Sequence, residues 1–122
     1  MPSSWFCTAV DSIDPARLAD FWAQALGYEV RHELPNGSII IAEGPGTTPA
    51  LAFLPVAGPK EVKNRLHLDL NPDDQRAETE RLVALGATHT SIGQPSDAPW
   101  IVLADPEGNE FCQIPPTRTQ DA

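Results

Sequence analysis

Apolar side chains recur along the first half of the chain at two different periods. Between Asp14 and Gly27 they fall on one face of a helix, which the Asp14-Pro15 pair begins and the glycine ends. Four segments around this helix have the alternation or the β-branched content of strands: residues 5–10, 28–34, 38–43 and 50–55. The first half of the chain therefore predicts the element order βαβββ.

The second half of the chain predicts the same order again. Pro72 and Asp73 open a second helix, which is expected to run to about Leu85 and to stop at Gly86. The strands predicted around this helix are residues 65–70, 88–92, 100–104 and 109–114.

The two halves share short stretches of sequence as well as element order. Ala25-Leu26-Gly27 recurs as Ala84-Leu85-Gly86, an offset of 59 residues, and this offset carries Phe53 onto Cys112. Two copies of one supersecondary unit predict a pseudo-symmetric α+β fold with two βαβββ modules. A length of 122 residues suits a single domain, residues 1–122. We expect module one at about 5–55, a linker at 56–64, module two at about 65–114 and a tail at 115–122.

Charge and cysteine content narrow the classes of partner and the cellular compartment. The chain has 8 basic and 17 acidic residues, a net charge of −9, which disfavours nucleic acid and anionic membrane surfaces as partners. It has no apolar run of the roughly 20 residues that a membrane helix needs, and its first residues lack the basic and long apolar regions expected of a signal peptide. We therefore expect a cytoplasmic protein, in which Cys7 and Cys112 are free thiols or ligands rather than a disulfide.

The most informative segment for chemistry is the strand predicted at residues 65–70. Side chains alternate across a sheet, so the three leucines are expected to be buried under the helices while the three polar residues share the other face. The same test on the last strand places Phe111 on one side and Glu110 and Cys112 on the other. The polar face is either simply solvated or part of a site. The leucines are Leu66, Leu68 and Leu70, and the polar residues are Arg65, His67 and Asp69.

Three stretches of the chain together resemble a known family. They are the helix that starts Asp14-Pro15-Ala16-Arg17-Leu18, the strand Arg65-Leu66-His67-Leu68-Asp69-Leu70, and the turn Asp105-Pro106-Glu107-Gly108-Asn109 with the strand after it. With the double βαβββ order, they resemble a glyoxalase-like domain of the vicinal oxygen chelate superfamily over residues 5–114. The resemblance implies two modules that form a cup-shaped, incompletely closed β-sheet barrel, and it implies a homodimer.

The resemblance also implies four positions for metal ligands. They fall on Cys7, Phe53, His67 and Cys112, with Thr8 as the alternative to Cys7. A phenylalanine cannot bind a metal, so this set departs from the family's pattern. His67, Cys112 and Cys7 can hold zinc with one open position. Buried cysteines also act as small hydrophobic residues, and we favour a cup that has lost its metal and binds a small organic ligand.

Two functions follow from this interpretation. One is an enzyme of lyase, isomerase or dioxygenase type, with His67 as acid or base. The other is a non-catalytic protein that sequesters a small molecule, as bleomycin-resistance proteins do; a third reading is an accessory domain with a self-filled cup. The acidic chain suits a cationic, partly aromatic ligand, and Trp22 is expected in the core. The residues expected to bind the ligand are Cys7, Phe53, Arg65, Asp69, Trp100, Glu110 and Cys112.

One cluster of basic residues stands out in the acidic chain. Lys60, Lys63 and Arg65 lie between the predicted modules and can clamp an anionic group, or they can form a solvated hinge.

Overall fold

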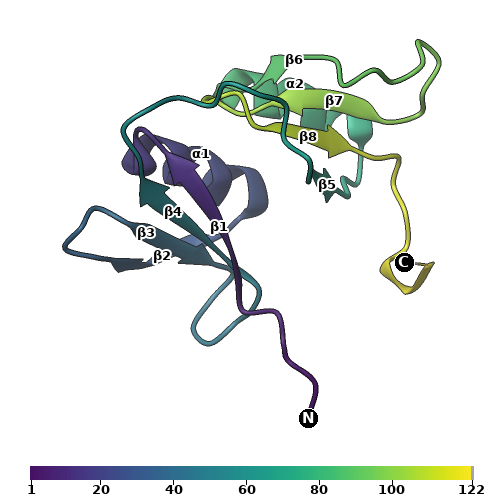
Figure 1. The fold of residues 1–122 in the computed structure, drawn as a ribbon. Helices are drawn as coiled ribbons and strands as arrows, with labels where there is room; N and C mark the ends of the chain where they lie inside the picture. The colour runs from purple at the N-terminus through teal and green to yellow at the C-terminus, as the bar shows by residue number, and fades with distance from the viewer. Residues whose placement is uncertain (122) are drawn as a thin grey trace. The chain divides into compact units, whose positions relative to one another are not determined.

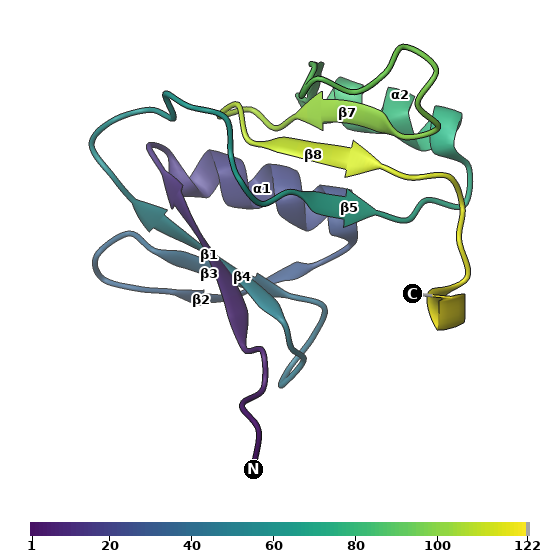
Figure 2. The ribbon, with the colours of Figure 1, turned by 45° about the vertical axis from the view of Figure 1, so that its right-hand side comes forward.

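The computed structural model describes residues 1–121 and divides into two compact units, residues 1–59 and a second unit from Lys60 onward. Each unit has one four-stranded mixed sheet and one α-helix (Figures 1 and 2). The element order is βαβββ in both, as the sequence predicts, and the fold class is α+β. Residues 60–64, predicted as linker, belong to the second unit. None of the helices described is long and apolar enough to span a membrane.

The first unit is built around a sheet with the strand order β1-β4-β3-β2. Strand β1 runs parallel to β4, and the other neighbours are antiparallel. Helix α1 begins after Asp14, whose carboxylate accepts a hydrogen bond from the backbone N–H of Arg17, and ends at Gly27, where φ is 69°. The elements are β1 (Cys7–Ser12), α1 (Pro15–Leu26), β2 (Glu29–Glu33), β3 (Ile39–Ala42) and β4 (Ala50–Pro55).

The core of the first unit lies between α1 and one face of this sheet. Ile41 and Phe53 have no exposed surface, and the helix buries Leu18 and Trp22 against the sheet, so the predicted core position of Trp22 is confirmed. Burying aromatic and branched side chains of this size supplies most of the driving force for folding. Cys7 is three residues before Val10, which is level with Phe53. Because side chains alternate along a strand, this odd number places Cys7 on the opposite face of the sheet.

The second unit repeats this plan with the strand order β5-β8-β7-β6. Strands β5 and β8 are parallel, and the other neighbours are antiparallel. Asp74 caps α2 by accepting a hydrogen bond from the backbone N–H of Ala77 at 3.1 Å, and the helix ends at Gly86. The elements are β5 (Leu68–Leu70), α2 (Gln75–Leu85), β6 (Thr88–His89), β7 (Ile101–Ala104), β8 (Glu110–Gln113) and a short 3₁₀ helix (Thr119–Asp121).

The segment before β5 differs from the expectation. Leu66, predicted to be buried, is 88% exposed, and Leu68 and Leu70 are only half-buried. The physical reason is that the strand begins at Leu68, so Leu66 has no place in the sheet. Two further elements are shorter than predicted: β6 has two residues, and α2 starts after its cap at Asp74 rather than at Pro72.

Candidate ligand-binding face of the second unit

The register of the second sheet sorts its side chains into two faces. Asp69 is level with Cys112, and Cys112 with Val102, so these three side chains share one face. Phe111 and Leu103 lie on the other face and are fully buried with Leu82 of α2. The parity predicted for Phe111 and Cys112 is therefore confirmed.

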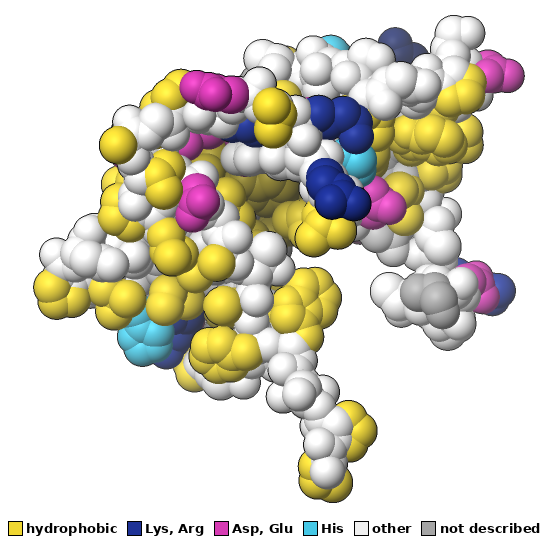
Figure 3. All heavy atoms as spheres, viewed as in Figure 1, with side chains coloured by type: hydrophobic (Ala, Val, Ile, Leu, Met, Phe, Trp, Pro, Cys, Tyr) yellow, Lys and Arg dark blue, Asp and Glu magenta, His cyan; other side chains and the backbone are white. Residues whose placement is uncertain are grey.

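His67 immediately precedes β5 and is two residues before Asp69, so alternation continued by one residue predicts it on the side of Asp69 and Cys112. We call this the His67 face, defined by His67, Asp69, Val102, Glu110 and Cys112. In Figure 3, basic, acidic and histidine side chains gather over β5.

The imidazole of His67 has an unusual environment. Its Nε2 atom is buried, and among the described residues 1–121 it has no hydrogen-bond partner. A buried polar atom without a partner costs roughly 1–3 kcal/mol, so such atoms are few in folded proteins. A bound molecule with a complementary group would supply the missing hydrogen bond. Asp69, next along this face, is exposed.

Cys112 is held as a neutral thiol. It is 5% exposed and hydrogen-bonds to the side chain of Asp69. Burial raises the pKa of this thiol first, and the negative charge and hydrogen bond of Asp69 raise it further. Thiolates, not thiols, are nucleophiles and metal ligands, so this environment disfavours both roles for Cys112.

Glu110 is an ionised carboxylate with its charge already compensated. Lys60 Nζ lies 3.0 Å from Glu110 Oε1, and the backbone N–H of Asn64 donates to the same oxygen at 3.2 Å. Burial opposes ionisation, but hydrogen bonds from Lys60 and Asn64 outweigh it and lower the pKa of Glu110. The basic side chain of Lys60 is thus an internal ion-pair partner rather than a solvated hinge residue.

The turn before β8 is fixed by one carboxylate. Asp105 is 3% exposed, and its Oδ1 accepts hydrogen bonds from the backbone N–H groups of Glu107 at 2.9 Å and Asn109 at 3.0 Å. Gly108 completes the turn with a φ of 87°, where glycine is favoured. The side chain of Asn109 donates back to Asp105, which leaves its own oxygen to accept from Asn64 Nδ2 at 3.1 Å.

Phe53 and Cys112 are not equivalent positions. Phe53 is level with Val10 and lies on the buried helix side of its sheet, as Phe111 does in the second unit, whereas Cys112 lies on the opposite face. The offset of 59 residues matches the helix ends, but because it is an odd number it carries a side chain from one face of these strands onto the other. Phe53 is fully buried in the core of the first unit.

The remaining predicted site residues lie in separate places. Cys7 is half-buried at the start of β1, on the sheet face opposite Phe53, whereas the alternative ligand, Thr8, shares the face of Phe53. Arg65 is exposed in the segment before β5, and Trp100 is half-buried directly before β7. Signals that the sequence analysis left unused are the pairing of Lys60 with Glu110 and the role of Asn64, because neither follows from alternation along a strand.

A zinc site does not fit the residues of either unit taken alone. Among residues 1–121, no group of three or more His, Cys, Asp or Glu side chains is arranged to hold a metal ion. On the His67 face, burial and the charge of Asp69 raise the pKa of the Cys112 thiol, which disfavours the thiolate that a metal needs. In the first unit, Phe53 has no ligand atom. Zinc held by His67, Cys112 and Cys7 stays a prediction, and no chemical step is derived through it.

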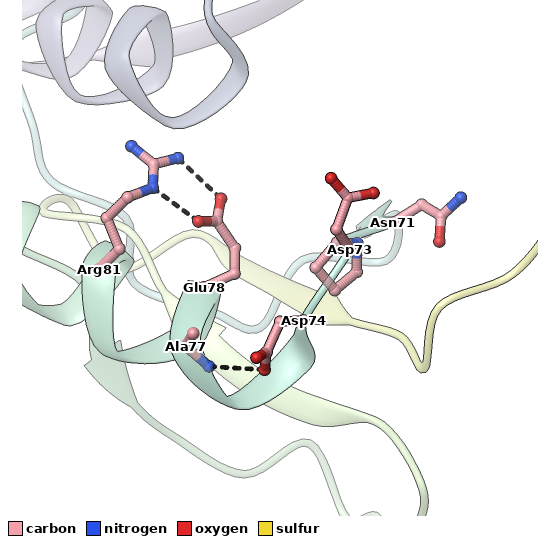
Figure 4. Close-up of a pocket in the computed structure, with 7 residues that line it drawn as sticks. Asn71, Asp73, Asp74, Ala77, Glu78 and Arg81 are labelled. Carbon is pink, nitrogen blue, oxygen red and sulfur yellow. Dashed lines mark hydrogen bonds and ion pairs between the residues drawn. The ribbon is translucent and has the colours of Figure 1, made fainter.

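A pocket of about 430 Å³ lies at the start of α2 (Figure 4). Arg81 and Glu78 form a two-point ion pair across it, at 2.6 and 2.7 Å, and Asp74 is occupied in capping the helix. Neither His67 nor Cys112 lines this pocket. Its lining residues are Asn71, Pro72, Asp73, Asp74, Ala77, Glu78 and Arg81.

Comparison with known proteins identifies the family. The sequence profile described as "Glyoxalase-like domain" matches residues 7–114. The chain belongs to this glyoxalase-like domain family. No curated protein matches the chain in sequence.

Solved structures share its fold at low sequence identity. An enzyme of the glyoxalase/bleomycin resistance protein/dioxygenase family from Burkholderia phytofirmans is 18% identical, with a TM-score of 0.69 over 94% of this chain and 100% of that one. An antibiotic-binding protein from Streptomyces is 20% identical, with a TM-score of 0.66 over 95% and 98%. Glyoxalase I from Leishmania major is 14% identical, with a TM-score of 0.68 over 93% and 87%. At these identities, the likeness shows the glyoxalase-like fold.

Proposed function

We propose that this glyoxalase-like protein binds a small organic molecule at the His67 face. The observation that carries the proposal is the buried Nε2 of His67, which has no partner among the described residues. A neutral imidazole nitrogen can donate or accept a hydrogen bond, and a ligand that pairs with it relieves the cost of leaving it unpaired. Val102 and Cys112 are the buried apolar residues of the same face.

The charges on this face favour a cationic ligand. Asp69 is exposed beside His67, whereas Glu110, the other carboxylate on the face, is already neutralised by Lys60. The chain as a whole carries a net charge of −9, which attracts cations and repels anions. A molecule with a positive group for Asp69, a polar group for His67 and an apolar or aromatic body meets these requirements.

Binding without turnover is better supported than catalysis. Two groups on the face that would serve as base or nucleophile are occupied: Glu110 by Lys60 and Asn64, and the thiol of Cys112 by Asp69. The antibiotic-binding relative supports a binding protein of this fold. An enzyme is the second candidate, because His67 and Asp69 remain on this face as groups for acid–base chemistry. Structural relatives described as glyoxalase I and as an oxidase support this candidate.

The experiment is a thermal-shift screen of the full chain. The probes are metal-free bleomycin and a set of cationic aromatic molecules, with anionic molecules of matched size as the comparison. We expect a cationic probe to raise the melting temperature of the wild-type protein and to lose roughly tenfold in affinity, about 1.4 kcal/mol, in His67→Ala. His89→Ala is the matched control, because His89 is an exposed histidine of the same unit.

Two results decide between the alternatives. Equal binding to wild type and His67→Ala, or preference for the anionic probes, would contradict the proposed site. Elemental analysis of natively purified protein tests the metal: stoichiometric zinc, lost in Cys112→Ser, would instead support the metal-dependent enzyme.

A further inference from the structure

The segment that leads into His67 is held by polar contacts rather than by packing. Residues 61–67 form no strand, and the apolar side chains within them are exposed: Val62 by 76% and Leu66 by 88%. The segment is instead tied to the beginning of β8, where Glu110 receives Lys60 and the backbone N–H of Asn64. An apolar core therefore cannot account for the position of this segment.

Glu110 and His67 are each next in the chain to the first pair of the parallel ladder. The ladder begins with Leu68 and Phe111, and His67 directly precedes Leu68 as Glu110 directly precedes Phe111. The carboxylate that ties the segment down is therefore next to the pair at which the segment enters the sheet.

The hydrogen bonds of Glu110 with Lys60 and Asn64 are strong because the carboxylate is ionised and largely buried. The Glu110 side chain is 9% exposed and the Lys60 side chain 21%, so solvent screens the pair little. Hydrogen bonds with an ionised partner are about twice as strong as those between neutral groups. The side chain of Asn64 adds a contact to Asn109, and Asn109 is itself held by Asp105. A continuous set of hydrogen bonds thus runs from the turn before β8 to the segment before His67.

We propose that Glu110 is a positioning residue, which fixes the segment 60–67 through Lys60 and Asn64 and thereby sets the orientation of the His67 imidazole for the ligand. The proposal rests on the proposed function, because it assumes that His67 meets the ligand. A carboxylate suits this task because its two oxygens only accept hydrogen bonds. One of them can therefore accept from an ammonium group and a backbone N–H at the same time. Glu110 itself then has no contact with the ligand.

The test measures the imidazole directly, by ¹H–¹⁵N NMR of the histidine side chains at fixed pH. Glu110→Ala removes the acceptor of both Lys60 and Asn64. We expect the His67 signals to broaden and to move toward those of an exposed histidine. Glu110→Gln keeps an oxygen for the Asn64 N–H, so we expect a smaller change and partial rescue. His32 and His89, both exposed, are internal references and should not move.

Glu78→Gln is the matched control. It removes another ion pair of the second unit, the 2.6 Å contact with Arg81 on α2. We expect this variant to leave the His67 signals unchanged. If Glu110→Ala folds poorly, Glu110→Gln and Lys60→Met make the same comparison.

Two outcomes separate this proposal from the proposed function. Unchanged His67 signals in folded Glu110 and Lys60 variants would overturn the positioning role, whatever binds. A probe whose affinity is insensitive to His67→Ala would overturn the ligand site, while the NMR result still decides the role of Glu110. If both proposals hold, Glu110→Ala weakens the cationic probe roughly tenfold and Glu110→Gln less, with the Glu78→Gln protein binding as the wild type does.

Discussion

The two units share the same arrangement of strands and helix, here called the frame, but they carry different side-chain chemistry on the sheet face opposite the helix. Both pair their first and last strands in parallel at the same spacing, and both cap their helices with aspartate and end them at glycine. The face opposite the helix carries Ala9, Ala52 and Leu54 in the first unit, and Asp69, Glu110 and Cys112 in the second. The residues facing the helices determine the frame, and the opposite face is free to carry chemistry, which in this chain is concentrated in the second unit.

The largest effect expected is the loss of either core phenylalanine. Phe53→Ala and Phe111→Ala should each lower the free energy of unfolding by about 3–5 kcal/mol, because each leaves a cavity in a fully buried position. Urea unfolding measures this, with Phe6→Ala, 69% exposed, as the matched control. If Phe53→Ala weakened ligand binding while hardly changing stability, the assignment of Phe53 to the helix side would be wrong.

The next effect concerns Glu110, on a face that in strand β4 of the first unit carries Ala50, Ala52 and Leu54. Glu110→Gln should lower the free energy of unfolding by about 1–3 kcal/mol at pH 7, because it leaves Lys60 without its charged partner. The pKa of Glu110 is lowered in the folded protein, so its contribution is complete above the ordinary glutamate pKa of about 4.3 and is lost as the pH falls further, through the folded-state pKa.

Urea unfolding of both proteins between pH 7 and pH 3 checks the sign. The difference between wild type and Glu110→Gln should shrink on the acid side of about pH 4.3. A difference that stays constant or grows there would contradict the assignment. Glu78→Gln, which removes the ion pair with the exposed Arg81 within α2, should cost only about 0.3–0.5 kcal/mol.

A smaller effect separates two aspartates that lie on the face opposite the helix in their own units, Asp69 and Asp11. In a Cys7→Ser background, Asp69→Asn should accelerate alkylation of Cys112 severalfold, because it removes one cause of the raised pKa of that thiol; each pKa unit recovered is worth about tenfold in thiolate. Asp11→Asn, in the first unit, should leave the rate unchanged. Equal rates in the two variants would show that burial alone protects Cys112.

The smallest effect is expected at Leu66. Because this side chain is 88% exposed, Leu66→Ala should change the free energy of unfolding by less than about 0.5 kcal/mol. Leu82→Ala, fully buried in the same unit, is the comparison and should cost about 2–5 kcal/mol. A loss of that size at Leu66 would restore the sequence-based expectation that it packs under a helix.

The frame was predictable from sequence because its signals are local. Asp14, Gly27 and Gly86 mark helix ends within a few residues of the chain, and the turn from Asp105 to Asn109 satisfies its own backbone groups. Alternation then gave the correct parity of Phe111 against Cys112.

The sequence-based predictions that failed depended on pairing between residues that are distant in the sequence. An offset of 59 taken from the helix ends carried Phe53, on the helix side of its sheet, onto Cys112, on the opposite face of the other sheet. Leu66 alternates correctly but lies before the first residue that pairs with β8. The partners of Glu110 come from a segment without regular structure, for which periodicity carries no information.

The parallel pairing of each unit's first and last strands has a consequence for how the chain folds. Val10 must meet Phe53, and Leu68 must meet Phe111, across an equal separation of 43 residues. The entropic penalty of closing a chain segment grows with the logarithm of its length, so the two units face the same topological barrier. Any difference between their folding rates would therefore report side-chain interactions, which makes this chain an internally controlled system for separating topology from sequence.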